Sequence, residues 1–144
     1  MPIRCEIVSQ DRIVYQDDVE IVVLPGVEGV MGILPNHAPL LTTLKYGIIT
    51  VRKKGEEQFF TVAGGVAEVL PEAVVILADA AENVMEINLA RAEEARRRAE
   101  ELLNKISDVD TDEYLAAQAA LRRSTLRINA AQRYRSGQPR IGGG

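Results

Sequence analysis

Hydrophobic residues in the first half of the chain alternate with polar ones, as they do in β-strands. Ile3, Cys5 and Ile7 are separated by Arg4 and Glu6, which is the period of a half-buried strand. Short apolar runs bounded by Gly, Pro and charged residues predict further strands at 13–15, 19–24, 47–52, 58–63, 66–70 and 74–78. Short strands at this spacing predict an all-β sandwich or barrel, and the lack of a helix between them argues against a βαβ nucleotide fold.

From Ala80 onward the hydrophobic residues recur at helical spacing. The apolar face of a first helix holds Leu89, Ala92, Ala99, Leu102, Leu103 and Ile106. Glu94 and Arg98 lie outside that face at i,i+4, in the order that favours an ion pair. The pattern breaks at 107–110, and Asp110 with Glu113 predicts a capping box at the start of a second helix.

The second helix has a narrow, alanine-rich apolar stripe. Its members are Tyr114, Ala117, Leu121, Ile128 and Ala131. Burial stabilises by roughly 25 cal/mol per Å² of apolar surface, so a seam of alanines contributes little. We therefore expect a weakly held helical hairpin that can detach as an arm. The chain is predicted to be α+β, with a β-sandwich domain at 1–83, the hairpin at 84–136 and a disordered tail at 137–144.

Composition places the chain among ordinary globular proteins. Hydrophobic residues make up 47% and charged residues 26%, and no apolar stretch approaches the ~18 residues that span a bilayer. The N-terminus lacks the pattern of a signal peptide, and the single cysteine allows no internal disulfide, so we expect a reducing compartment. The alternate spacing of Cys5 with Ile3 and Ile7 favours a small buried hydrophobe over a reactive thiol.

Charge is distributed unevenly along the chain. The net charge is −4, yet residues 111–144 hold six arginines against two acidic residues. Arginine suits paired recognition of a carboxylate or phosphate because its planar fork donates two parallel hydrogen bonds. Nucleic acid is a poor candidate partner, since the chain as a whole is acidic and aromatic residues make up only 4%.

Candidates for catalysis and metal binding are weak. His37 is the only histidine, lies in a turn between prolines, and has no GxSxG nucleophile to serve, so a structural role is favoured. A metal site is not supported, because the sequence holds only one His and one Cys and so lacks the further ligands that such a site needs. The glycines at 26, 29 and 32 are not followed by the Gly-Lys-Ser/Thr of a phosphate loop and are expected to supply positive φ in turns. Gly64 and Gly65 predict a tight turn or bulge.

Three arginines form a candidate anion site. Arg123 and Arg127 are i,i+4 and share a face, so both can approach one anion. In an antiparallel hairpin the start of the first helix lies near the end of the second, which would bring Arg91 to the same place. The alternative, a solvated basic face, stays open.

Three segments resemble the epsilon subunit family of F-type ATP synthases. They are 29–41 (GVMGILPNHAPLL), 62–69 (VAGGVAEV) and 75–82 (VILADAAE). The helical segment 87–92 (INLARA) then matches the family motif Ile/Leu-Asp-x-x-Arg-Ala except at Asn88. The resemblance covers the chain up to its Gly-rich tail, and the first segment is the most specific part.

The resemblance implies a ten-stranded antiparallel β-sandwich followed by a two-helix hairpin. It also implies a non-catalytic subunit of the rotating central stalk, whose sandwich binds the gamma subunit and the ring of c subunits. The extended hairpin would meet acidic segments of the alpha and beta subunits and inhibit ATP hydrolysis. Residues expected at partner contacts are Arg122, Arg123, Arg127, Arg133 and His37.

In some bacterial members of that family the folded hairpin binds a regulatory ATP. Carried over by position, the ATP site would use Glu82, Asn88, Arg91, Arg123 and Arg127. Asn88 can cap a helix as Asp does, but it offers no carboxylate for a charge-assisted bond. We therefore expect ATP binding to be weak or absent, with no other cofactor.

The implied location is the cytoplasmic face of a bacterial plasma membrane, with peripheral association through the complex. A second hypothesis is a free-standing ATP-sensing module whose hairpin closes on nucleotide. The two differ in whether the chain co-purifies with a gamma subunit.

Overall fold

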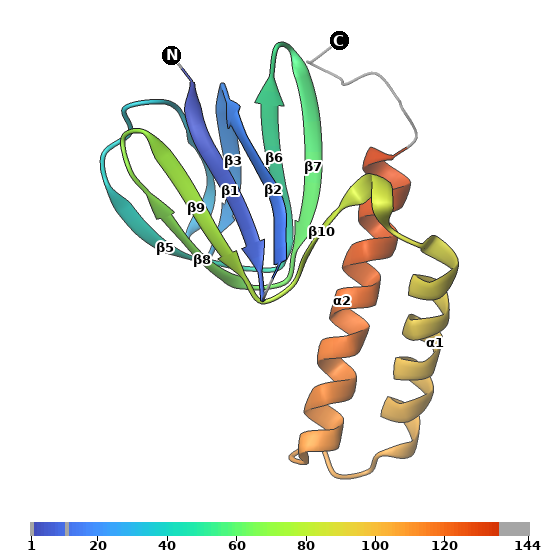
Figure 1. The fold of residues 1–144 in the computed structure, drawn as a ribbon. Coiled ribbons are helices and arrows are strands. Elements are labelled where there is room, and N and C mark those ends of the chain that lie inside the picture. Colours follow the sequence, from blue (N-terminus) through green and yellow to red (C-terminus); the bar gives the residue numbers. More distant parts are fainter. Residues whose placement is uncertain (1, 11, 136–144) are drawn as a thin grey trace. The chain divides into compact units, whose positions relative to one another are not determined.

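The computed structural model describes residues 2–10 and 12–135, which divide into two compact units between Val84 and Met85 (Figure 1). The expected tail at 137–144 lies outside the described residues. The described part of the first unit contains ten strands: β1 (Ile3–Ser9), β2 (Arg12–Val19), β3 (Ile21–Gly26), β4 (Gly29–Ile33), β5 (Leu40–Leu44), β6 (Gly47–Lys53), β7 (Glu56–Val62), β8 (Gly65–Val69), β9 (Ala73–Ala78) and β10 (Ala81–Asn83).

The strands pair in the order β10-β7-β6-β3-β5-β8-β9-β1-β2, and β4 pairs with β3. The ten strands of the predicted sandwich are confirmed, but one pairing departs from the antiparallel expectation. Strand β1 runs parallel to β9, with Cys5 opposite Val74. Parallel neighbours need a long connection, and residues 10–72 supply one. A pairing so distant in sequence leaves no local signal.

The strands near the two ends of this order, β2 at one and β7 at the other, pack against each other and enclose the core. The ring of Tyr15 in β2 packs against Phe60 in β7 at a centroid distance of 5.0 Å. The predicted alternation in β1 is confirmed, because Ile3, Cys5 and Ile7 are all fully buried. Burial raises the pKa of the Cys5 thiol to about 12, which fits a packed hydrophobe and not a reactive thiol.

In the segment around β4, only one of the three glycines that were expected to have positive φ does so. Gly29 has a φ of +139°, but Gly26 and Gly32 lie within strands and lack positive φ, so the prediction was wrong for these two. Gly26 is required by space, since a Cβ there would lie 2.9 Å from the Gly29 carbonyl oxygen. Gly64 and Gly65, where a tight turn or bulge is predicted, have φ values of +89° and +135°, and the chain bends there between β7 and β8, which do not pair with each other.

The helical part begins later than the sequence pattern predicts. Strand β10 pairs with β7, Ala81 opposite Val62, and a short 3-10 helix (Val84–Glu86) follows it. Helix α1 (Leu89–Lys105) starts only after Asn88, whose side-chain oxygen accepts a hydrogen bond from the Arg91 amide at 3.0 Å. Tertiary pairing with β7 overrides the local pattern at Ala81, whereas the predicted Asn88 cap is confirmed.

Helix α2 (Asp112–Tyr134) is capped by Thr111 and not by Asp110. The Thr111 hydroxyl accepts a hydrogen bond from the Tyr114 amide at 3.2 Å. Asp110 instead donates its own amide to the Asp108 carboxylate at 3.0 Å, within the linker. The predicted capping box is therefore wrong by one position, because a threonine with extended backbone follows Asp110.

The seam between α1 and α2 is as narrow as predicted. Its most buried members are Ala92 and Ala99 from α1 and Ala117, Ser124, Ile128 and Ala131 from α2. Leu102 is an exception to the predicted face, since it is 52% exposed. At the end of the hairpin away from the linker, the Arg135 guanidinium donates a hydrogen bond to the Ile87 carbonyl oxygen. The start of α1 and the end of α2 therefore lie together, as in an antiparallel hairpin. The predicted Glu94–Arg98 ion pair is confirmed at 3.9 Å.

Candidate functional site

The five residues of the predicted ATP site come from both units. Glu82 lies in β10 of the sheet unit, whereas Asn88, Arg91, Arg123 and Arg127 belong to the hairpin. Within the hairpin, a helical rise of ~1.5 Å per residue and the Arg135–Ile87 contact place Arg91 level with the last turns of α2. Arg127 is close to that level, and Arg123 lies about one turn further toward the linker.

The two predicted residues at the start of α1 differ in what they can offer an anion. Arg91 is exposed and carries a full positive charge. The Asn88 oxygen already accepts from the Arg91 amide, and the remaining amide group can only donate. Asn88 can therefore donate to a phosphate oxygen but cannot hold a guanidinium as a carboxylate would. At position 88 the hairpin therefore offers an anion a hydrogen-bond donor and no carboxylate.

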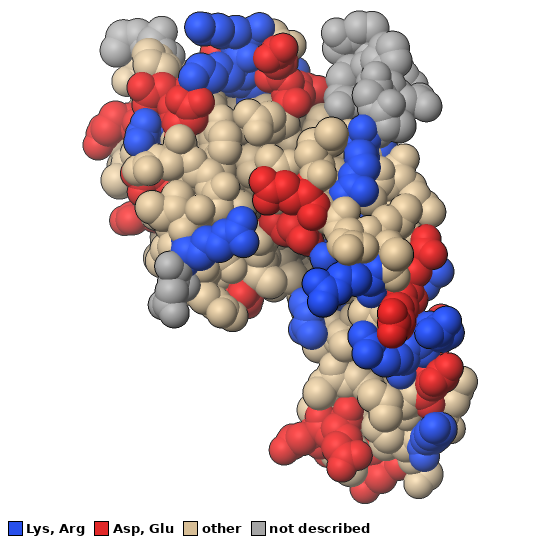
Figure 2. Space-filling view, turned by 45° about the vertical axis from the view of Figure 1, so that its right-hand side comes forward, with Lys and Arg blue, Asp and Glu red and all other residues tan. Residues whose placement is uncertain are grey.

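The predicted partner-contact arginines line the second half of α2. Arg122, Arg123 and Arg133 are exposed, and Arg127 is half-buried. The Arg133 guanidinium lies 5.4 Å from the ring centroid of Tyr134, within the range of a cation–π contact. Figure 2 shows basic side chains over the middle of the hairpin, whereas acidic ones gather at its linker end. Asp108, Asp110, Asp112 and Glu113 belong to that acidic end.

His37 sits in the loop between β4 and β5. Its Nδ1 lies 2.7 Å from the Ala38 carbonyl oxygen, and the preceding Asn36 donates its amide to Pro71 at 2.7 Å. Asn36 has a φ of +66°, which this residue type tolerates better than most. The loop is thus fixed to the β8–β9 turn, and His37 is half-buried at its surface.

A row of apolar side chains crosses the outer face of the sheet and was missed by the sequence interpretation. Strand register places Val66 opposite Leu77, Leu77 opposite Val8 and Val8 opposite Ile13. Residues opposite one another point to the same face. Leu77 is 53% exposed and Ile13 60% exposed, so this apolar row faces solvent in the isolated chain. The sequence did hold a signal, since 73–78 reads AVVILA and is apolar on both faces of the strand.

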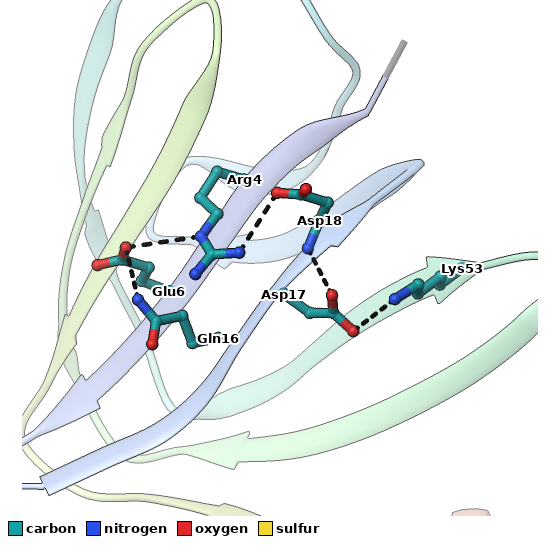
Figure 3. A network of polar contacts seen from close by, with 6 residues as sticks. All are labelled: Arg4, Glu6, Gln16, Asp17, Asp18 and Lys53. Carbon is teal, nitrogen blue, oxygen red and sulfur yellow. Dashed lines mark hydrogen bonds and ion pairs between the residues drawn. The ribbon is translucent and has the colours of Figure 1, made fainter.

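The same face turns polar at the next outward-facing pair of β1 and β2, Glu6 opposite Gln16 (Figure 3). Gln16 donates to Glu6 at 3.1 Å, and Arg4 donates to Asp18 at 3.4 Å. On the other side of β2, Lys53 donates to Asp17 at 2.8 Å. That bond and the Asp18 amide hold the pKa of the Asp17 carboxyl below its usual value. The apolar row is therefore bordered by paired charges, as the core of an interface is by its rim.

Neither a metal centre nor a membrane span is found in the described residues. No group of three His, Cys, Asp or Glu side chains within 2–10 and 12–135 is arranged to hold a metal ion. None of the helices in the same residues is both long and apolar enough to cross a bilayer.

Comparison with protein families matches nearly the whole chain. A family model described as the beta-sandwich domain of the ATP synthase delta/epsilon chain matches residues 2–84. A second, described as the long alpha-helix domain of the same chain, matches residues 85–132.

Bacterial relatives match at similar length. The ATP synthase epsilon chain of Herpetosiphon aurantiacus is 44% identical over 96% of this chain and 100% of its own length. An epsilon chain of Dehalococcoides mccartyi is 43% identical over 92% of this chain and 94% of its own.

Two solved structures share the fold at lower identity. A chain of the Euglena gracilis mitochondrial ATP synthase OSCP/F1/c-ring structure aligns with a TM-score of 0.73 and 24% identity, covering 91% of this chain and 81% of that one. A chain of the Tetrahymena thermophila mitochondrial ATP synthase central stalk/c-ring structure aligns with a TM-score of 0.58 and 17% identity, covering 90% of this chain and 96% of that one. With its sheet and its hairpin each matched by a domain of one family, this chain belongs to the delta/epsilon chain family of ATP synthases.

Proposed function

We propose that this chain is the epsilon subunit of a rotary ATP synthase, a non-catalytic part of the central stalk. The observation that carries this proposal is the match to a bacterial epsilon chain over that relative's entire length. In this role the sheet unit would bind the gamma subunit and the ring of c subunits, and the hairpin would regulate. The subunit would associate with the cytoplasmic face of the bacterial plasma membrane through the complex.

The apolar row is the surface best suited to hold a permanent partner. Solvent-exposed apolar side chains that lie together usually mark an interaction site. Leu77 lies between Val66 and Val8 in the register, so it occupies the middle of the row. We assign this face to the gamma subunit, and we keep His37 as a second contact on the same unit.

Co-purification with gamma tests this assignment. The variant Leu77→Gln should reduce capture of the chain by tagged gamma by about tenfold, as expected for a central apolar contact. Val109→Gln is a matched control, because Val109 is 56% exposed but lies in the hairpin linker. Failure of the wild-type chain to bind gamma at all would contradict the proposed function.

The hairpin is proposed as the brake on ATP hydrolysis. Its seam is made largely of alanines such as Ala92 and Ala99, so separating the helices exposes little apolar surface. Once extended, the arginines of α2 would meet acidic segments of the alpha and beta subunits. Long-range attraction of that kind is screened by salt, so inhibition should weaken as ionic strength rises.

Regulatory ATP is proposed at the basic face of the folded hairpin, with low affinity. The ligand would favour the closed, non-inhibitory state, because binding selects the conformation that assembles its site. NMR titration of the full chain should show shifts at Arg91, Arg123 and Arg127 only at millimolar ATP, and Asn88→Asp should strengthen them. An absence of shifts in both proteins would end the ATP proposal without affecting the subunit assignment.

The alternative of a free-standing ATP sensor predicts a different outcome. Such a module would stay monomeric in the presence of gamma and would close on nucleotide alone. Gamma capture therefore separates the two functions in a single experiment.

A further inference from the structure

The two ends of the helical hairpin are closed in different ways. At one end the linker 106–111 joins α1 to α2 covalently (Figure 1). At the other end the start of α1 and the end of α2 have no covalent link, and there the Arg135 guanidinium donates a hydrogen bond to the Ile87 carbonyl oxygen. We call this contact the Arg135 clasp.

Both partners of the clasp are anchored at helix termini. Arg135 is the C-cap of α2, and its amide donates to the Ala131 carbonyl oxygen at 3.3 Å. Asn88, which directly follows Ile87, is the N-cap of α1, and its carbonyl oxygen accepts the Ala92 amide at 3.0 Å. The Ile87 carbonyl therefore lies just outside the hydrogen-bond ladder of α1. Arg135 supplies it with a charged donor, and such bonds contribute more than neutral ones.

Packing along the seam is closest in the half of the hairpin that holds the clasp. Ser124, Ile128 and Ala131 of α2 are all buried there. Toward the linker the helices leave an open groove of about 430 Å³, and Leu102 in its lining is exposed. The linker end is thus held together by the chain itself, whereas the other end depends on non-covalent contacts.

Opening of the hairpin about its linker displaces the clasp more than the rest of the seam. Helix α2 has 23 residues, which correspond to a length of ~34 Å. A rotation of about 10° at the linker would move its far end by about 6 Å, and a hydrogen bond is lost beyond ~3.5 Å. Contacts near the linker, such as those of Ala117, move far less. The clasp therefore has to break before the helices can separate.

We propose that the Arg135 clasp sets the equilibrium between the closed and the open hairpin. This inference rests on the proposed function, in which the open hairpin is the inhibitory form. The seam is made largely of alanines, whose burial contributes little, so one hydrogen bond from a charged donor is a large share of what keeps the helices together. Loss of the clasp shifts the population toward the open form and leaves the sheet unit as it is. Arg135 is in this sense a positioning residue.

A thiol buried in the seam provides the probe. Ser124 is 2% exposed, and Ser124→Cys changes a single atom. In the full chain the introduced thiol can react with dithio-bis-nitrobenzoate only when the hairpin opens, so its reaction rate follows the open population. Cys5 is fully buried in the core of the sheet unit and serves as the internal control.

Two arginines at the end of α2 provide a matched pair of variants. Arg135→Met keeps the aliphatic stem but removes the donor, and it should accelerate reaction of the introduced thiol by about tenfold. Arg133→Met removes the same charge next to Tyr134, outside the clasp, and should react like the Ser124→Cys chain alone. Arg135→Lys keeps a charged donor and should restore part of the slow reaction. The effect of Arg135→Met should persist from about 0.1 M to about 1 M salt, because the acceptor is neutral.

Several outcomes would overturn the proposal. These are equal thiol reaction with and without Arg135→Met, an equal acceleration by Arg133→Met, or a parallel acceleration at Cys5, which would indicate a general loss of stability. In the assembled enzyme Arg135→Met should lower ATP hydrolysis, since more of the hairpin is open. Faster thiol reaction with unchanged hydrolysis would support the clasp and contradict the proposed brake, so the two failures can be told apart.

Discussion

Tyr15 places a polar hydroxyl group in the apolar core of the sheet unit. Its ring packs on Phe60, but its buried hydroxyl has no hydrogen-bond partner among the described residues. Burial, followed by the charge of Asp17, raises the pKa of this hydroxyl to about 12. A buried polar group without a partner costs free energy that an apolar replacement of the same shape avoids.

We expect Tyr15→Phe to leave the free energy of unfolding unchanged or to raise it by up to ~1 kcal/mol. Tyr15→Ala removes the ring as well and should cost ~3 kcal/mol. Urea unfolding of the three proteins measures both differences. A loss of stability in Tyr15→Phe comparable to that in Tyr15→Ala would mean that the hydroxyl has a partner in solution.

Asp17 makes the sheet unit sensitive to acid. Its pKa is lowered first by the Lys53 hydrogen bond, so the folded state favours the charged carboxylate. A lowered pKa contributes stability above the unfolded-state value of 3.8, and that stability is lost as the pH falls through the folded-state value. Wild type should therefore lose more stability than Asp17→Asn between about pH 6 and about pH 2.

Urea midpoints at these two pH values test the acid sensitivity. Lys53→Gln removes the same hydrogen bond from the other side, so it should reduce the pH dependence in the same way. An identical pH dependence in all three proteins would show that the Lys53–Asp17 bond does not form in solution.

At the scale of the elements, the hairpin relies on its caps because its seam buries little. Replacing Asn88 with Ala removes the acceptor of the Arg91 amide and should cost the first turn of α1 ~1 kcal/mol. Amide hydrogen exchange should accelerate there by about fivefold, whereas amides in β1 should exchange as in wild type. Asn88→Asp keeps the acceptor and serves as the control. Equal exchange in the Ala and Asp variants would contradict a capping role.

How well an element could be predicted depended on whether its cause was local. The alternation of Ile3, Cys5 and Ile7 is written in adjacent residues, and the structure buries all three. Strand β10 and the parallel β1–β9 pair depend on partners far away in sequence, so no window of residues reveals them. The exposed position of Leu102 escaped prediction because helical spacing alone fixes the direction of a side chain and not the width of the seam.

The candidate site shows the same division. The approach of Arg91 to the end of α2 followed from the antiparallel hairpin, since chain direction alone determines it. The apolar row did not follow, because inward and outward side chains cannot be told apart where a strand is apolar on both faces, as at 73–78. The binding roles of Glu82, Asn88, Arg91, Arg123 and Arg127 stay predictions.

At the scale of the whole molecule, the two units have separate tasks in the proposed function. The sheet unit has its own buried core, and its exposed apolar row is suited to a lasting contact with gamma. The hairpin has a thin seam and a basic second helix, which suit a reversible contact. Assembly should therefore depend on the sheet unit, whereas inhibition should depend on the hairpin.

The most direct test compares ATP hydrolysis by the assembled enzyme containing the full chain with that containing a chain lacking residues 88–144. Because the sheet unit is compact on its own, gamma should retain the shortened chain in equal amount. We expect hydrolysis to rise on truncation while assembly is unchanged. Equal hydrolysis by the two fully assembled enzymes would contradict the account, since the hairpin would then not be the brake.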